Sequence, residues 1–169
     1  YSTDLLAPAL QLTKNCELKG IVTGSPHKIP KWKKLYNIKD KNIYNYQNFE
    51  QIANNNEIDV IYIVLPPSMH SEYSIRAANT GKHVWCEKPM STTLADSTAM
   101  ANAAASSAGK TIIGYNYTKN PAVTHARRLI DSGVIGRVSG FFCRYDVDNE
   151  ADGNRPWSWR MSRAQSGTG

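Results

Sequence analysis

The stretch DVIYIVLPPSMH, from Asp59 to His70, decides the fold. After Asp59 it forms a continuous apolar run, which is typical of a strand that is buried on both faces of a parallel sheet. Two prolines end this strand, and Ser68 is expected to cap a helix that continues to Asn79. A buried strand followed directly by a helix is half of a β–α–β unit, so this stretch predicts an α/β fold.

Strand-like and helix-like segments alternate on both sides of this stretch. Further strands are expected at residues 17–24, 42–44, 82–86 and 111–115. Helices are expected at residues 5–10, 29–36, 93–107 and 122–131, and also from Phe49 onward. This alternation with short connections predicts a doubly wound parallel sheet with helices on both faces. Residues 138–147 mix aromatic, apolar and polar side chains, so we expect them to begin a sheet of different character.

Composition excludes several classes of protein. Hydrophobic residues make up 41% and charged residues 20% of the 169, a globular balance, and the longest apolar run is too short to cross a bilayer. Three cysteines form no CxxC pair, so neither a disulfide framework nor a metal site is expected. The net charge of +6 is concentrated in lysines at 28–41, which lack a nucleic-acid-binding motif, so neither nucleic acid nor membrane is expected as a partner.

Both ends of the chain predict a fragment of a longer protein. The first residue is Tyr1, not Met, and an amphipathic helical pattern begins within a few residues of it. At the other end, residues 166–169 read as the start of a glycine turn. A natural small domain with frayed ends is the alternative.

Ligands of open parallel sheets bind outside the carboxyl ends of the strands, so the residues after each strand are the candidates. Ser68 and His70 follow the central strand at the start of a helix, where the alternative is a cap and a solvated side chain. Glu87 and Lys88 follow the next strand, where burial of two charges costs free energy unless they are paired. A lysine held there could exchange protons with a substrate hydroxyl; a surface ion pair is the alternative.

Two further polar groups lie near predicted strand ends or loops. Asn116 places a carboxamide after the strand at 111–115, although it could equally be a turn residue. Arg160 lies beside Trp159, where the pair could clamp a ring or a phosphate, or hold a loop by a cation–π contact.

The strand at 17–24 raises the question of a dinucleotide. An acidic residue at its end would take the ribose hydroxyls of NAD, but this chain has Thr23, Gly24 and Ser25, followed by Lys28 and further lysines. Hydroxyls and lysines favour a 2′-phosphate and hence NADP. A solvated, lysine-rich helix face is the alternative.

Four ordered motifs resemble the Gfo/Idh/MocA oxidoreductases. They are GKHVWCEKPMSTTLADS (81–97), VIYIVLPPSMHSEYSIRAANTGKH (60–83), GYNYTKNPAV (114–123) and LIDSGVIGRV (129–138). The segment NIYNYQNFEQIA (42–53) and the Thr23–Gly24 turn look most like the glucose–fructose oxidoreductase branch. The resemblance implies a Rossmann domain at 1–118, whose Gly-rich loop would precede Tyr1. It also implies that 119–169 begin an α+β domain with a mainly antiparallel sheet.

The resemblance also implies roles for named residues. Lys88 would be the catalytic residue, placing the nicotinamide and contacting the reacting hydroxyl. The residues implied to bind the cofactor are Thr23, Lys28, Tyr44, Pro66, Ser68, His70, Glu87, Lys88, Asn116, Trp159 and Arg160. Of these, Thr23, Lys28 and Tyr44 would hold the adenosine 2′-phosphate. Thr118 and Lys119 depart from the family pattern, which puts the substrate rim in doubt.

The implied function is an NADP(H)-dependent oxidoreductase that acts on a sugar or polyol, with NAD as the alternative cofactor. A catalytic aspartate and histidine would follow residue 169. Two other readings stay open: an NAD-dependent glycosidase that oxidises its sugar transiently, and a non-catalytic regulator that binds dinucleotide and sugar. The full-length protein is expected to be a homo-oligomer in the cytoplasm, with the periplasm as the alternative.

Overall fold

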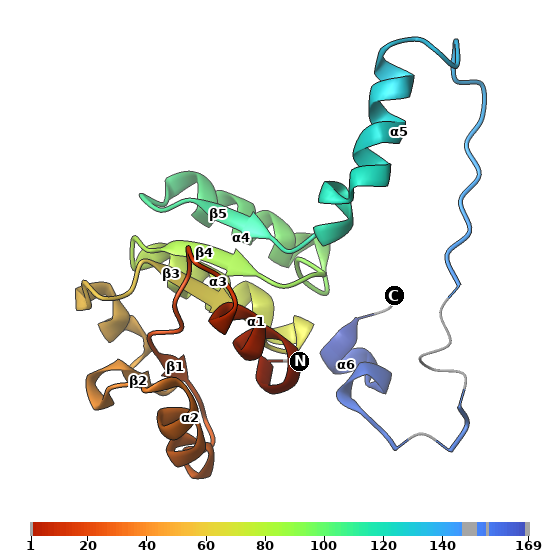
Figure 1. The fold of residues 1–169 in the computed structure, drawn as a ribbon. Coiled ribbons are helices and arrows are strands. Elements are labelled where there is room, and N and C mark those ends of the chain that lie inside the picture. The colour runs from red at the N-terminus through yellow and green to blue at the C-terminus, as the bar shows by residue number, and fades with distance from the viewer. Residues whose placement is uncertain (1, 147–151, 155, 168–169) are drawn as a thin grey trace.

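The five strands are all parallel and form two groups. The computed structural model describes residues 2–146, 152–154 and 156–167. The strands are β1 (Ile21–Val22), β2 (Ile43–Tyr44), β3 (Val60–Ile63), β4 (His83–Cys86) and β5 (Thr111–Ile113). β1 pairs with β2, and β3, β4 and β5 form a second sheet in that order (Figure 1). Parallel strands joined by helical crossovers confirm the predicted α/β fold.

Helices cover one face of the three-stranded sheet. In Figure 1, α3 (His70–Asn79) lies behind β3 and β4, and α4 (Leu94–Ser106) packs beside α3, behind β4 and β5. Alternate strand residues are buried in the core, which is formed by Ile61, Ile63, Val84, Cys86, Tyr73, Ala77, Ala78 and Met100, among others. On the other face of the sheet, the rings of Tyr62 and Trp85 stack with centroids 5.0 Å apart.

The other helical segments of the described residues differ in length and type. The α-helices are α1 (Ala7–Gln11), α2 (Ile29–Tyr36), α5 (Pro121–Asp131) and α6 (Arg163–Ser166), and Ser2–Leu6 forms a π-helix. Six 3₁₀ segments are described: Pro26–Lys28, Asp40–Asn42, Phe49–Asn54, Pro67–Met69, Asn116–Lys119 and Trp159–Met161. Thr93 is the N-cap of α4, since its hydroxyl accepts a hydrogen bond from the Asp96 amide at 3.1 Å. None of the helices formed by the described residues has the length and apolarity needed to cross a bilayer.

Arg76 of α3 joins the two groups of strands. Its guanidinium donates to the Tyr46 carbonyl at 2.7 Å, just after β2, and to Glu50 at 2.6 Å. The same group lies over the rings of Phe49 and Tyr73, at 5.1 and 4.8 Å from their centroids. Because α3 also packs on β3 and β4, this one side chain ties the β1–β2 pair to the three-stranded sheet.

Four sequence predictions differ from the structure. The strand expected at 17–24 is paired only at Ile21–Val22, and the helix from Phe49 is a 3₁₀ helix. Ser68 does not cap α3: its side chain is exposed, the prolines before it fold into a 3₁₀ turn, and the N-cap is Met69.

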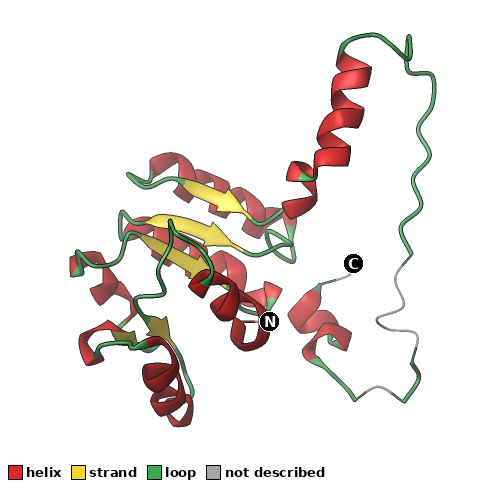
Figure 2. Ribbon diagram, in the orientation of Figure 1, coloured by secondary structure: helices red, strands yellow, loops and turns green. Residues whose placement is uncertain are grey.

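The fourth difference concerns residues 138–146, which were expected to begin a strand. They form an extended segment without strand pairing. This segment follows α5, which projects away from the two sheets (Figure 2). A strand exists only when a neighbour pairs with it, and no described segment pairs with this one. Val147 lies outside the described residues.

Candidate functional site

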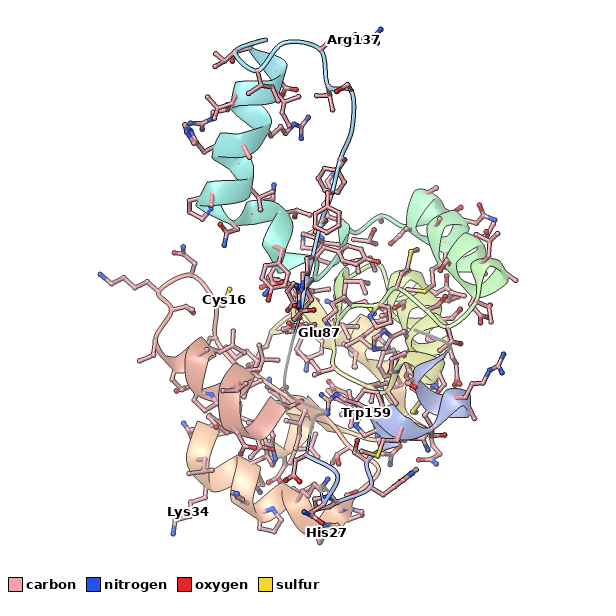
Figure 3. The ribbon with its side chains drawn as sticks, turned by 90° about the vertical axis from the view of Figure 1, so that its right-hand side faces the viewer. Cys16, His27, Lys34, Glu87, Arg137 and Trp159 are labelled. Carbon is pink, nitrogen blue, oxygen red and sulfur yellow. The ribbon has the colours of Figure 1, made fainter. Side chains whose placement is uncertain are left out.

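The carboxyl ends of β3, β4 and β5 bring three loops to one edge of the sheet. Because the strands are parallel and paired in register, the segments after Ile63, Cys86 and Ile113 lie side by side. Figure 3 shows Glu87, on the middle loop, near the centre of the molecule, whereas Lys34 and Arg137 lie at its periphery. This edge is where α/β folds of this kind bind their ligands.

Lys88 combines a fixed backbone with a free side chain. On one side the Glu87 amide donates to the Ile63 carbonyl at 3.0 Å, and on the other the Pro89 carbonyl lies 2.7 Å from Nδ1 of His70. The Lys88 side chain is exposed and makes no ion pair with the described residues, so the alternative of a Glu87–Lys88 surface pair is not what the structure shows. An unpaired ammonium on a fixed loop can donate hydrogen bonds to a ligand oxygen.

Glu87 is held by aromatic neighbours. The Tyr62 hydroxyl donates to its carboxylate, and the Lys88 amide donates to the other carboxylate oxygen at 3.3 Å. A side chain at Gly114 would place its Cβ 3.4 Å from both carboxylate oxygens and 3.3 Å from Nε1 of Trp85. Gly114 therefore lies directly against Glu87 and Trp85, and a side chain there would make close contact with both.

His70 is buried, with 1% of its surface exposed, so it is not the solvated residue of the alternative interpretation. Its Nε2 lies 2.8 Å from the Leu65 carbonyl and its Nδ1 2.7 Å from the Pro89 carbonyl. Of its neighbours on the first loop, Pro66 is half-buried and Ser68 exposed. Asn116, on the third loop, is exposed at the start of a 3₁₀ turn.

A second group of predicted residues lies at the end of β1. The Thr23 hydroxyl accepts a hydrogen bond from the Ser25 amide at 3.0 Å, which shapes the turn, and Lys28 follows with an exposed side chain. Residues 18–39 contain no Asp or Glu, so no carboxylate of that segment opposes an anionic ligand.

The side chain that lies against this turn is that of Tyr46, whereas Tyr44 meets the turn through its backbone, where its carbonyl accepts a hydrogen bond from the Thr23 amide at 3.0 Å. The Tyr46 ring occupies the space where a side chain on Gly24 would lie, since a Cβ there would be 2.8 Å from Cε2 of Tyr46. Tyr44 is buried in the core, and its hydroxyl accepts a hydrogen bond from Asn55 at 2.8 Å. Tyr44 stays a prediction for the role implied for it, and Tyr46 is an alternative candidate for the same function. Tyr46 lies two residues beyond the end of β2, a position that sequence reasoning did not weigh.

Trp159 and Arg160 lie on the segment that returns to the first loop. The Arg160 guanidinium lies 4.6 Å from the Trp159 ring centroid, which matches the cation–π alternative. The following helix, α6, contacts the 3₁₀ turn Pro67–Met69, so the C-terminal segment reaches the carboxyl edge (Figure 1). Arg160 itself is exposed.

Metal and thiol chemistry find no support at this edge. Among the described residues, no group of three His, Cys, Asp or Glu side chains could hold a metal ion. Cys86 lies at the end of β4, but burial raises the pKa of its thiol and keeps it protonated.

Taken with the parallel sheet, these loops define a dinucleotide-binding Rossmann domain. The model of the family described as "Oxidoreductase family, NAD-binding Rossmann fold" matches residues 1–115, and that of the GFO/IDH/MocA C-terminal domain matches 123–169. The chain belongs to the Gfo/Idh/MocA oxidoreductase family, as its motifs predicted.

Individual relatives agree with this assignment. A levoglucosan dehydrogenase of Pseudarthrobacter phenanthrenivorans is 37% identical over 122 residues, which cover 72% of this chain and 31% of the relative. An NADP(+)-dependent D-xylose 1-dehydrogenase of Haloarcula marismortui is 32% identical over 125 residues, covering 72% and 34%. The solved structure of an aldose-aldose oxidoreductase from Caulobacter crescentus, complexed with glycerol, superposes with a TM-score of 0.83 at 32% identity, covering 100% of this chain and 49% of that one. The chain thus spans about one third of the curated relatives and about half of the solved structure.

Proposed function

We propose that this chain forms the dinucleotide-binding part of an NADP(H)-dependent oxidoreductase that acts on a sugar or polyol hydroxyl. The observation that carries the proposal is Lys88, an exposed ammonium whose backbone is anchored on both sides at the carboxyl edge of the sheet. Relatives of this chain include enzymes named for levoglucosan, xylose and aldose substrates, which supports a sugar as the substrate class.

The residues at the end of β1 fit the 2′-phosphate of NADP better than the free ribose of NAD. Lys28 supplies a cation, the Thr23–Ser25 turn supplies hydroxyls and amides, and the Tyr46 ring lies beside that turn. A carboxylate, which would repel the phosphate and favour NAD, is absent from residues 18–39. Pro66, Ser68, Glu87, Asn116 and the Trp159–Arg160 pair would line the remaining length of the cofactor.

When bound, an oxidised nicotinamide accepts a hydride from a carbinol carbon. The hydroxyl proton would pass to the histidine expected after residue 169, and the work of this chain would be to hold the substrate oxygen while that carbon is oxidised. The Lys88 ammonium would donate a hydrogen bond to the hydroxyl oxygen and stabilise the negative charge that develops there. Because the backbone on both sides of Lys88 is already fixed, little reorganisation is needed as this charge appears.

The test is a dehydrogenase assay with the full-length protein. Aldoses and polyols are offered with NADP+ or NAD+, and the appearance of reduced nicotinamide is followed by its absorbance. We expect turnover with at least one sugar and a clear preference for NADP+. Turnover with NAD+ alone would contradict the cofactor assignment, and release of an aglycone without net reduction would favour a transient-oxidation glycosidase.

A second test separates the two tyrosines. Tyr46→Ala should weaken NADP(H) binding several-fold, since it removes the ring beside the Thr23–Ser25 turn. Tyr44→Phe removes only the hydroxyl that accepts from Asn55 and should leave NADP(H) binding unchanged. The opposite pattern, measured by nicotinamide fluorescence titration, would restore Tyr44 to the role that the resemblance implied.

We further propose that the Rossmann domain ends at residue 118 and the second domain begins at residue 119. We also propose that the full-length protein forms a homo-oligomer in the cytoplasm. The division is supported by the position of Asn120 and Pro121, which cap and start α5 immediately after the Rossmann segment. Size-exclusion chromatography with light scattering on the full-length protein tests the oligomeric state.

A further inference from the structure

We propose that His70 is a positioning residue that clips the first strand-end loop to the loop carrying Lys88, and that its two ring nitrogens serve separate parts of the reaction. The inference rests on the proposed function and adds to it a residue that acts through others. His70 is the first residue of α3, yet it is only 1% exposed, and its ring lies between the Leu65 and Pro89 carbonyls. Each ring nitrogen faces the backbone carbonyl of a different loop.

The first bond secures the loop between β3 and α3. Nε2 lies 2.8 Å from the carbonyl of Leu65, the residue before Pro66. Pro66 and Pro67 lack amide hydrogens, so this segment has few backbone groups of its own with which to hold its position. Within the turn, the Met69 amide donates to the Pro66 carbonyl at 2.9 Å, and the imidazole supplies the link to α3.

The second bond secures the catalytic loop. Nδ1 lies 2.7 Å from the carbonyl of Pro89, immediately after Lys88. The other side of Lys88 is fixed by the bond from the Glu87 amide to the Ile63 carbonyl at 3.0 Å. Removing the His70 bond would leave Lys88 anchored on one side only.

The chemistry of the ring suits this role. Both partners are carbonyl oxygens, so each bond requires a hydrogen on the ring nitrogen that makes it. A neutral imidazole carries one such hydrogen and secures one loop, whereas the doubly protonated ring secures both. No other described side chain is hydrogen-bonded to backbone on both of these loops.

Two amide substitutions can separate the bonds. An asparagine amide nitrogen lies as many bonds from Cβ as Nδ1, so His70→Asn can keep the bond to Pro89. A glutamine amide nitrogen matches Nε2 in the same way, so His70→Gln can keep the bond to Leu65. His70→Phe preserves the ring and removes both bonds. His83→Gln is a control at the opposite edge of the sheet, where His83 of β4 is exposed and its Nδ1 accepts a hydrogen bond from the Lys110 amide at 2.9 Å.

The experiment measures kcat, the dissociation constant for NADP(H) and amide hydrogen exchange in the full-length protein. We expect His70→Asn to keep kcat within about threefold and to weaken NADP(H) binding about tenfold. His70→Gln should do the reverse, with kcat reduced about tenfold or more because Lys88 is misplaced. His70→Phe should show both losses, and His83→Gln neither.

Hydrogen exchange distinguishes failure of this inference from failure of the proposed function. His70→Asn should raise exchange at 65–69 alone, and His70→Gln at 90–92 alone, whether or not a substrate has been found. Equal changes at both loops in both variants, or no change in His70→Phe, would overturn the clip. A parent protein that shows the two-loop exchange pattern but no dehydrogenase activity would overturn the proposed function and leave the clip standing.

Discussion

The β1–β2 pair and the β3–β5 sheet differ in how far polar contacts hold them. Beside the apolar contacts of Val22 and Tyr44, the β1–β2 pair has a buried polar network: Asn42, 1% exposed, donates to the Lys19 carbonyl and to Glu57, each at 3.1 Å, and accepts from Asn55 at 2.7 Å. In the β3–β5 sheet the buried contacts are apolar side chains packed against α3 and α4. The stability that a polar network provides depends on the direction of its hydrogen bonds and on its charges. The stability that an apolar core provides depends on how well its side chains fill the available volume.

The proposed roles of the two regions follow the same division. The end of β1 would choose between dinucleotides, and its side chains are exposed and charged. The end of β4 would carry the chemistry, and its backbone is fixed by buried bonds. Arg76 of α3 links the two regions through its bonds to the Tyr46 carbonyl and to Glu50.

The largest effect is expected where the chemistry lies. Lys88→Met removes the ammonium and leaves the anchored backbone, so kcat should fall about 10²- to 10³-fold. NADP(H) affinity should change little by comparison. Lys110→Met is the control, because Lys110 is an exposed lysine before β5, at the amino edge of the sheet. A kcat for Lys88→Met within a few fold of the parent would show that the assigned role is wrong.

Next in size is a break in the polar network. Asn42→Leu removes the bonds to the Lys19 carbonyl and to Glu57 and one of the two bonds made by the Asn55 amide, which should lower the free energy of unfolding by about 1–3 kcal/mol. Urea denaturation measures this loss, and hydrogen exchange should place it at β1–β2 more than at β3–β5. Asn56→Leu, at an exposed neighbour, should have a much smaller effect. If hydrogen exchange rose equally in both sheets, the polar network would not stabilise β1–β2 more than β3–β5.

A smaller effect is expected on cofactor choice. Lys28→Ala should raise the dissociation constant for NADP(H) about tenfold, since it removes one charge-assisted contact to phosphate. Affinity for NAD(H) should not change, because NAD(H) lacks that phosphate. Lys31→Ala on the adjoining helix controls for general loss of positive charge. If both variants weakened both dinucleotides alike, Lys28 would belong to a solvated helix face.

The smallest effect is the acid response of the β1–β2 network. Hydrogen bonds from Lys41, then Lys39 and Asn42, lower the pKa of Glu57 from 4.5 to about 2. A carboxylate with a lowered pKa stabilises the fold above its ordinary pKa, and this contribution is lost as the pH falls from about 4.5 towards 2. Glu57→Gln should therefore flatten the fall in melting temperature across this window. Glu17→Gln, at an exposed ion pair with Lys19, should not. An unchanged slope in Glu57→Gln would contradict the assignment.

Sequence patterns predicted the β3–β5 sheet and its helices better than the polar network at β1–β2. The run after Asp59 marks β3, and the Thr93–Asp96 spacing marks the start of α4, because periodicity and capping are local signals. The family motif likewise brought Glu87 and Lys88 to the carboxyl edge. The polar network around Asn42 has no such pattern, since its partners come from positions 19, 55 and 57 and meet only in the folded chain.

The site was less predictable where a role depends on side-chain direction. Tyr44 and Tyr46 have the same chemistry, and only the fold shows that the second lies over Gly24. From the sequence, His70 was interpreted as a cofactor-binding residue or as a solvated side chain. Nothing in the sequence indicates that it is buried between two backbone carbonyls. The strand expected from 138 failed for a related reason, because β-like composition does not supply a pairing partner.

Transfer of deuterium to the dinucleotide tests the central claim most directly. The full-length protein is incubated with NADP+ and sugars or polyols carrying deuterium on their carbinol carbons, and the reduced dinucleotide is analysed by mass spectrometry. We predict that NADPH acquires a deuterium from at least one of them and that Lys88→Met slows this transfer about 10²- to 10³-fold. Bound dinucleotide that stays unlabelled with every sugar, or labelling at the parent rate in Lys88→Met, would contradict the account.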